Sequence, residues 1–165
     1  MNSIYGNFRI ELLFKHSELE DAWGSPLPTA SEKGYPKIFN RMVHWVLFAD
    51  DVAIAYTCSL LMPDKSYALV GNTYVRKEWR SKGLHAHLLK ERNASEHLYG
   101  VPLITILNPI ESTDVDNLVK VVSKLGYEKI DNYIDVADIM PLTSYTKLDL
   151  KEHQQMWRLD YGSRV

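Results

Sequence analysis

The chain has 165 residues, 45% of them hydrophobic and 24% charged, which fits one globular domain and excludes the low-hydrophobicity composition of disordered chains. Its formal net charge of -2 offers no basic field for nucleic acid, and its single cysteine, Cys58, leaves no intrachain disulfide. No stretch approaches the roughly 20 apolar residues of a spanning helix, so we expect a cytoplasmic protein with no nucleic-acid or membrane partner.

The first third of the chain predicts a strand, a helix and a long loop. Residues 8–14 are rich in strand formers, and residues 17–23 have the pattern of a short helix. Ser17 is the expected N-cap of this helix, with Glu20 at the capping-box position. Glycines and prolines interrupt residues 24–37, which predicts an irregular loop of the kind that often carries specificity.

The middle of the chain predicts three antiparallel strands. Residues 45–49 and 52–62 are two β-rich runs joined by the polar pair Asp50 and Asp51, which indicates a hairpin. A third strand is expected over residues 67–75. Gly71 and Asn72 interrupt it and indicate a bulge or a close backbone approach.

Helices and strands alternate in the rest of the chain. We expect a helix over 84–99 that ends at Gly100, a strand over 101–107, a helix over 115–125, and one or two strands over 127–140. A polar tail follows, in which Asp149 and Glu152 could form the capping box at the start of a short helix. This order predicts an α+β fold, a mixed and mostly antiparallel central sheet flanked by helices, as a single domain over 1–165 with 141–165 as a C-terminal extension.

The stretch most informative about chemistry is residues 72–86, where a strand runs through a basic, glycine-containing turn into a helix. A helix start exposes backbone N–H groups and a positive dipole end, which bind phosphates. Arg80 and Lys82 add charge there, and Gly83 permits close approach. A solvated turn with an ordinary helix cap is the alternative.

This stretch resembles the GNAT superfamily of N-acetyltransferases. After its fourth strand that family has Arg or Gln, two residues, Gly, one residue, then Gly or Ala; here Arg80, Gly83 and His85 occupy those positions. The preceding Tyr74 and Val75 and the later Gly126–Tyr127 pair also match, so the similarity covers roughly 45–133. His85 departs from the pattern because its ring is bulkier than Gly or Ala.

The resemblance implies an acyl-CoA N-acyltransferase fold and a reaction in which an amine attacks the thioester directly. It assigns acetyl-CoA as the default co-substrate and a primary amine of a small molecule, peptide or protein as acceptor. Separately, the spacings of His85, His87 and His97 place no ligand pair on one helix face, so we expect no metal. The backbone of Thr73, Tyr74 and Val75 is expected to meet the pantetheine. The pyrophosphate is expected at Arg80, Ser81, Lys82, Gly83, Leu84, His85 and Ala86. Asn108 either borders the pantetheine arm or is a turn residue before Pro109.

Catalytic groups are not marked in the sequence. The family often has a tyrosine that protonates the leaving thiolate, and Val122 occupies that position here. His44, Glu78 and loop carboxylates such as Glu32 are the candidates for a general base. A weak or inactive acyl-CoA-binding module, or an interaction module that uses 142–165 as a contact surface or homodimer arm, therefore stays open beside the enzyme.

Two further residues have predicted roles outside the motif. Cys58 lies in a strand with no basic residue beside it, which predicts a buried core position. The four tryptophans, Trp79 among them, are expected to be packing residues, and Trp79 is the only one close enough to the motif to touch a cofactor as well.

Overall fold

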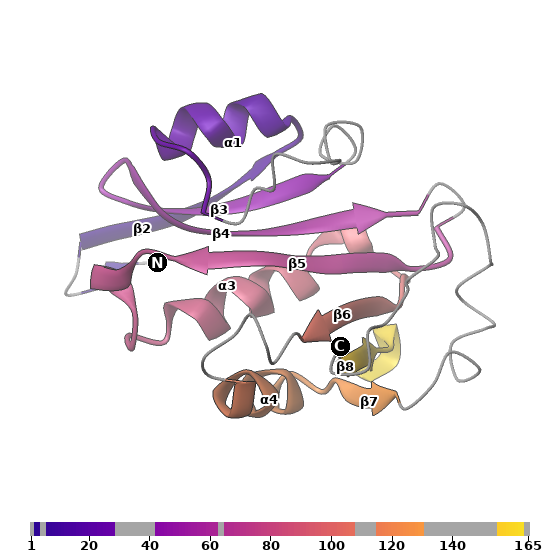
Figure 1. Cartoon of the computed structure of the whole chain (residues 1–165). Coiled ribbons are helices and arrows are strands. Elements are labelled where there is room, and N and C mark those ends of the chain that lie inside the picture. The colour runs from indigo at the N-terminus through magenta and orange to yellow at the C-terminus, as the bar shows by residue number, and fades with distance from the viewer. Residues whose placement is uncertain are drawn as a thin grey trace. The chain divides into compact units, whose positions relative to one another are not determined.

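A computed structural model of the chain describes residues 2–3, 6–28, 42–62, 65–107, 115–130 and 155–163 (Figure 1). The chain divides into two compact units, one of Met1–Leu61 and Val70–Arg92, the other of Met62–Leu69 and Asn93–Val165. Strand β5 (Ala68–Val75) begins in the second unit and ends in the first. No helix within the described ranges has both the length and the apolar character needed to cross a bilayer.

The first unit contains the predicted meander. Its elements are β1 (Asn2–Ser3), β2 (Gly6–Leu13), α1 (His16–Trp23), β3 (Val43–Ala49), β4 (Val52–Leu61), the end of β5, the 3-10 helix η1 (Lys77–Trp79) and α3 (Leu84–Asn93). The strands are neighbours in the order β1-β2-β3-β4-β5, and the first three pairs are antiparallel. The predicted hairpin at Asp50 and Asp51 is confirmed.

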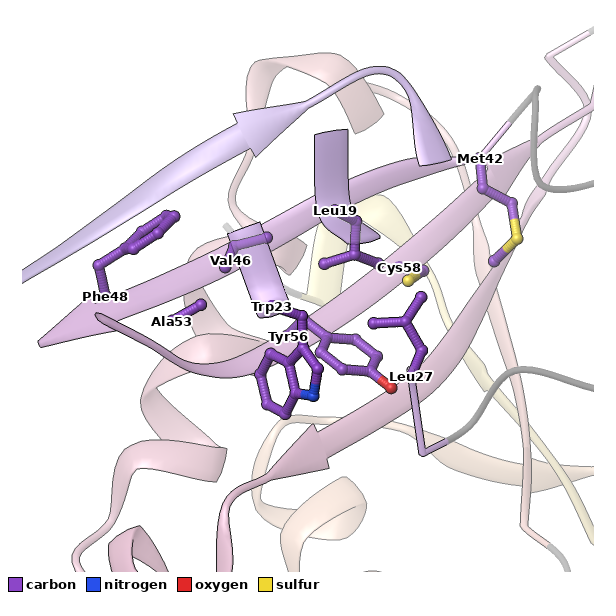
Figure 2. Close-up of a cluster of buried hydrophobic side chains, with 9 residues drawn as sticks. All are labelled: Leu19, Trp23, Leu27, Met42, Val46, Phe48, Ala53, Tyr56 and Cys58. Carbon is purple, nitrogen blue, oxygen red and sulfur yellow. The ribbon is translucent and has the colours of Figure 1, made fainter. Parts of the chain in front are cut away.

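Helices cover both faces of the β3–β4 hairpin. Val46 and Tyr56 pair across the two strands and pack in a cluster with Leu19 and Trp23 of α1 (Figure 2). Because side chains alternate between the faces of a strand, Thr57 points to the opposite face, where Arg92 of α3 donates a hydrogen bond to it. All seven residues of β3 are consequently buried.

Helix α1 begins one residue earlier than its sequence pattern predicts. Lys15, with extended backbone, is the N-cap and makes no side-chain cap bond, so the predicted cap at Ser17 is wrong. Leu19 and Trp23 stand four residues apart and are almost fully buried. Burial of this apolar stripe fixes the helix more strongly than one cap bond would, because a cap contributes only about 1 kcal/mol.

The second unit is built around a parallel strand pair extended by two antiparallel strands. Its elements are the start of β5, the 3-10 helix η2 (Glu96–Leu98), β6 (Leu103–Leu107), α4 (Val115–Lys124), β7 (Glu128–Ile130), β8 (Gln155–Leu159) and the 3-10 helix η4 (Tyr161–Ser163). β6 runs parallel to β5, and β8 lies between β6 and β7, antiparallel to both. The expected mixed, mostly antiparallel α+β architecture is confirmed.

Two sequence predictions fail here. The helix expected over 84–99 ends at Asn93, because the Ser95 hydroxyl accepts the His97 N–H at 3.3 Å and starts η2. The polar tail contains strand β8, in which Met156 and Leu159 are almost fully buried. Its five residues are too short a run to show strand periodicity, and β6 and β7 supply the pairing. Asp149, Glu152 and the expected strand residues 131–140 lie outside the described residues.

Substitutions in β8 test whether this strand belongs to the core or to a dispensable tail. Leu159→Ala should lower the free energy of unfolding by about 2–5 kcal/mol, because it leaves a cavity at a buried position. Arg158→Ala, whose guanidinium pairs with the exposed Asp160, should lower it by less than about 1 kcal/mol. Urea unfolding of both variants measures the difference. Equal, small effects would instead favour the interaction-tail hypothesis.

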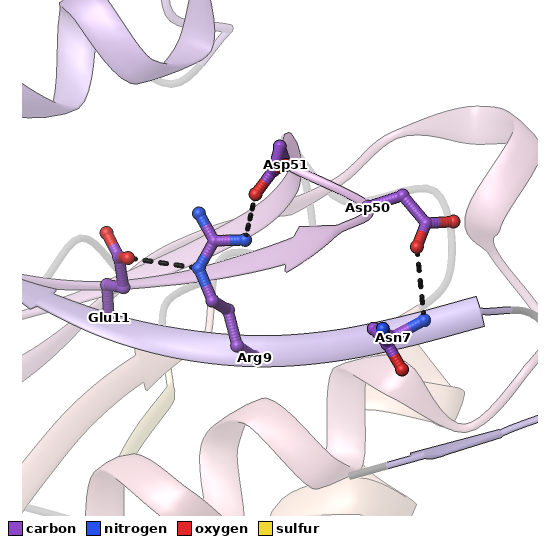
Figure 3. Close-up of polar contacts among 5 residues, drawn as sticks. All are labelled: Asn7, Arg9, Glu11, Asp50 and Asp51. Carbon is purple, nitrogen blue, oxygen red and sulfur yellow. Dashed lines mark hydrogen bonds and ion pairs between the residues drawn. The ribbon is translucent and has the colours of Figure 1, made fainter.

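The β3–β4 turn is strained and is held by polar contacts to β2 (Figure 3). Asp50 and Asp51 have φ of 48° and 72°, which favour glycine or asparagine. The Asp50 carboxylate accepts the Asn7 N–H at 3.2 Å, and the Asp51 carboxylate pairs with the Arg9 guanidinium at 2.6 Å. Arg9 also pairs with Glu11 at 3.0 Å. The ion pair of Asp51 with Arg9 and the hydrogen bond of Asp50 with Asn7 therefore offset part of the turn strain.

Asp51→Gly should separate these two effects. Glycine removes the left-handed strain, a gain of about 1 kcal/mol, but also removes the exposed ion pair. At about 1 M salt the screening length falls to about 3 Å, so the variant should exceed the wild type in stability more at high salt than at low salt. Urea unfolding at two salt concentrations measures this, and a salt-independent difference would contradict the role given to Arg9.

Candidate functional site

The end of β5 is fastened to the first unit by Arg76. Its backbone N–H donates to the Ile54 carbonyl at 2.9 Å, and its Nε donates to the Ala53 carbonyl at 2.8 Å. Its Nη2 donates to the Trp23 carbonyl at 3.0 Å, and the guanidinium lies 3.9 Å from the Trp23 ring centroid. Although Arg76 belongs to the basic stretch, its contacts are therefore structural and set where the chain leaves the strand.

Arg80 folds back on the same strand end. Its Nε donates to the Val75 carbonyl at 2.8 Å, and its guanidinium carbon lies 5.2 Å from the Tyr74 ring centroid. The side chain is nevertheless exposed, so its charge is present at the surface of the turn. Arg80 thus bridges residues 76–79 back to the end of β5, and it supplies positive potential beside the start of α3.

The turn between η1 and α3 leads into a helix start whose backbone N–H groups have no helical acceptor. Ser81 and Gly83 are left-handed, with φ of 63° and 76°, and residues 80–83 are exposed. The His87 N–H donates to the Gly83 carbonyl at 3.1 Å, which is the first helical bond of α3. The N–H groups of Leu84, His85 and Ala86 precede that bond and have no acceptor within the helix. Such an end favours an anion.

Gly83 is needed for its backbone conformation. A Cβ built on it would meet no atom within 4 Å, so the protein itself does not crowd this position. Next to it, Leu84 is buried and anchors the helix start, while Lys82 remains exposed. The predicted basic turn and helix start are thus brought together in one exposed feature.

His85 sits half-buried in the first turn of α3. Burial is the main cause that lowers its pKa, and the charge of Arg92 on the same helix lowers it further. A neutral imidazole has one donor and one acceptor nitrogen. His85 is therefore equipped to hydrogen-bond a ligand at the helix start without adding a charge.

The strand residues expected to meet the cofactor have distinct environments. Thr73 is half-buried and its hydroxyl lies 2.8 Å from that of Thr57. Tyr74 packs edge-on against Trp23 at 5.9 Å, and Val75 is buried. Asn72 has φ of 50°, so the irregularity predicted at Gly71 and Asn72 is present as a left-handed residue. Nothing approaches Gly71 within 4 Å of a built Cβ.

The two described base candidates differ sharply in exposure. His44 is fully buried on β3, and its Nδ1 lies 2.9 Å from the Cys58 Sγ. Burial, with a smaller contribution from His16, lowers the pKa of His44 to about 4. Glu78 is exposed on η1. His44 therefore has the properties of a core residue, whereas Glu78 is accessible. Glu32 and Asn108 lie outside the described residues.

Packing confirms the predicted burial of Cys58 and describes the surroundings of Trp79 and Val122. Cys58 is buried as expected, and burial raises the pKa of its thiol to about 12, although Arg92 acts in the opposite direction. Its contact with His44 was missed because the two residues are neighbours only across the sheet. Trp79 packs edge-on against Phe8 at 5.9 Å, and Val122 is buried in α4.

A separate hollow in the first unit has a volume of about 260 Å³. Its walls come from β2, β3 and one side of α3, and the residues are Phe8, Arg9, Ile10, Leu47, His87 and Glu91. It contains none of the predicted site residues.

No family model matches the sequence, and no curated protein matches it. Solved structures do. The ribosomal-protein-S18-alanine N-acetyltransferase of Escherichia coli superposes with a TM-score of 0.64 at 18% identity, over 94% of each chain. The chain has the GNAT acetyltransferase fold. A Bacillus cereus IAA acetyltransferase (TM-score 0.64, 14% identity) and a Bacillus subtilis acetyltransferase solved with CoA (TM-score 0.61, 15% identity) each match over 93% of this chain and 99% of theirs.

Within this GNAT fold, one buried polar contact between α3 and β4 was not predicted from the sequence. Arg92 of α3 is 2% exposed, and its Nη1 donates to the Thr57 hydroxyl at 2.7 Å. Arg92 follows Leu84 and Leu88 at four-residue spacing, which places it on the buried stripe of the helix. That spacing was the signal available in the sequence.

The depressed pKa of His44 predicts acid sensitivity of the fold. An unfolded histidine has a pKa near 6.5, so between about pH 6.5 and pH 4 the unfolded chain binds a proton that folded His44 does not. This contribution is complete above about pH 6.5 and is lost as the pH falls, up to about 3 kcal/mol.

His44→Gln should reduce this loss of stability in urea unfolding between pH 7 and about pH 4.5. His85 and His97, whose pKa values burial also lowers, are present in both proteins and cancel in the comparison. Parallel stability curves for the two proteins would show that His44 is solvated or protonated in the folded state.

Proposed function

We propose that the protein is an N-acyltransferase that transfers an acyl group from acyl-CoA to a primary amine. The observation that carries the proposal is the exposed turn of residues 80–83 at the start of α3, with two cationic side chains and open helical N–H groups. The GNAT fold supports it, as does a structural neighbour solved with CoA. Acetyl-CoA is the default donor.

The residues of the turn divide the binding of the coenzyme among them. Arg80 and Lys82 supply charge for the pyrophosphate, while the backbone of residues 81–86 supplies N–H donors. The backbone of Thr73 to Val75 borders the pantetheine, and an N–H from this segment polarises the thioester carbonyl. Asn108 is proposed to border the same arm.

The reaction needs little chemistry from the side chains. The amine nitrogen attacks the thioester carbon, the N–C bond forms, and the C–S bond breaks with its electrons on the thiolate. A thiol with a pKa near 8.5 is a good leaving group, so the thiolate can take its proton from water although Val122 has none to give. Glu78, exposed directly after β5, is the described candidate for accepting the proton of the amine.

An acyl-CoA-binding module without turnover is the second candidate. The burial of Val122 and of His44 favours it, because neither offers a proton relay at an exposed site. Release of free thiol from acetyl-CoA in the presence of small amines, peptides and proteins distinguishes the two. The primary amine acceptor is proposed from the fold. The cytoplasmic location and a homodimer remain predictions.

Gly83→Glu should abolish coenzyme binding, because it places a carboxylate at the helix start. Titration calorimetry with acetyl-CoA should show wild-type binding and a loss of more than about tenfold in affinity in the variant. Gly100→Glu is the matched control. Gly100 has φ of 74°, close to the 76° of Gly83, and its Cβ would also meet no atom within 4 Å.

The two glycine variants carry the same backbone strain, so a difference between them reports the position of the charge. Gly83→Glu should lose acetyl-CoA affinity while Gly100→Glu keeps it. A folded wild type that binds no acetyl-CoA would sink the transferase proposal. Equal affinity in Gly83→Glu would move the coenzyme site away from this turn.

A further inference from the structure

A buried hydrogen-bond chain joins α3 to β5 through β4. The Arg92 Nη1 donates to the Thr57 hydroxyl at 2.7 Å, and that hydroxyl lies 2.8 Å from the Thr73 hydroxyl. Thr57 is fully buried and Arg92 is 2% exposed, so water does not compete for the bond between them. Breaking that bond leaves buried polar groups without a partner, which is costly.

The direction of the bonds can be worked out from the chemistry of the groups. An arginine guanidinium only donates, so the Thr57 oxygen must accept from Arg92. The Thr57 hydroxyl has one proton, which goes either to the Gly71 carbonyl at 3.4 Å or to the Thr73 oxygen. With Gly71 as acceptor, Thr73 donates to Thr57, and one hydroxyl makes all three bonds. The two partners of Thr57 on β5, Gly71 and Thr73, stand on either side of the left-handed Asn72.

This chain connects the two parts of the proposed coenzyme site. Arg92 follows the exposed start of α3 by about 12 Å at about 1.5 Å per residue. Thr73 begins the segment of β5 whose backbone borders the pantetheine in the proposed function. The pyrophosphate end and the thioester end are thus linked through two buried side chains.

We propose that Thr57 and Arg92 are positioning residues that fix the irregular part of β5 relative to α3, and so align the thioester with the bound pyrophosphate. The inference rests on the proposed acyl-CoA binding. Neither residue touches the coenzyme; they act through the backbone of residues 71–73. Losing these hydrogen bonds should therefore weaken the binding of a ligand that contacts both β5 and the turn before α3. It should not weaken the binding of a ligand that contacts the turn alone.

Thr57→Val tests this by removing the hydroxyl while keeping the shape of the side chain. Binding is followed by amide NMR shifts with two probes. Acetyl-CoA has both the pyrophosphate and the pantetheine, whereas ADP has the pyrophosphate but no pantetheine. We expect roughly tenfold weaker acetyl-CoA binding, equivalent to one or two hydrogen bonds. ADP affinity and the Gly83 amide shift should be unchanged, and Thr57→Ser, which retains the hydroxyl, should restore acetyl-CoA binding.

Each outcome decides one of the two proposals. A wild type that binds neither probe ends the proposed function, and the positioning role with it. If the wild type binds acetyl-CoA, two results for Thr57→Val overturn the positioning role alone. One is unchanged acetyl-CoA affinity, and the other is an equal loss of affinity for acetyl-CoA and ADP. If Thr57→Val does not fold, Arg92→Met removes the donor at the other end of the hydrogen-bond chain and is read by the same criteria.

Discussion

Burial of the β3–β4 hairpin on both faces is the constraint on which the first unit depends. Every residue of β3 is buried, so a helix must cover each face: α1 packs on the side of Val46 and Tyr56, and α3 covers the side of Thr57. The chain leaving β5 must therefore turn sharply before α3 can begin. The left-handed Ser81 and Gly83 make that turn, and the helix start with its open N–H groups is a consequence of packing as much as of function.

The sequence predicted the elements whose signal is local. The hairpin at Asp50 and Asp51, helix α4 and the turn before α3 were each evident from periodicity or turn residues. The end of α3 was wrong because a local contact of Ser95 starts η2. The start of α1 and strand β8 were wrong because packing or pairing with distant residues decides them. The same reason explains the candidate site. Its backbone turn was predictable, whereas contacts across the sheet, such as Thr57 to Arg92, were not.

The two faces of the hairpin solve the burial of polar groups differently. Under α1, His44 and Cys58 form a neutral pair, because burial lowers the pKa of the imidazole and raises that of the thiol. Under α3, Arg92 keeps its charge, since a guanidinium is not deprotonated in proteins, and hydroxyls satisfy it. A neutral pair can be replaced by apolar groups at little cost, whereas a buried charge such as that of Arg92 must keep its hydrogen-bond partners in place. The charged contact lies on the face of the hairpin that α3 covers, the helix whose start belongs to the proposed coenzyme site.

A fold that mainly positions its reactants can tolerate the absence of a dedicated acid. General acid catalysis contributes about 10²–10⁴-fold, and holding two reactants in a productive geometry contributes about 7–11 kcal/mol. Val122 forfeits only the smaller of these, and only to the extent that a thiolate needs help to leave. In the proposed reaction the larger contribution depends on how the thioester is aligned with the bound pyrophosphate. If Thr57 and Arg92 align it as proposed, the rate should be more sensitive to these two residues than to the missing tyrosine.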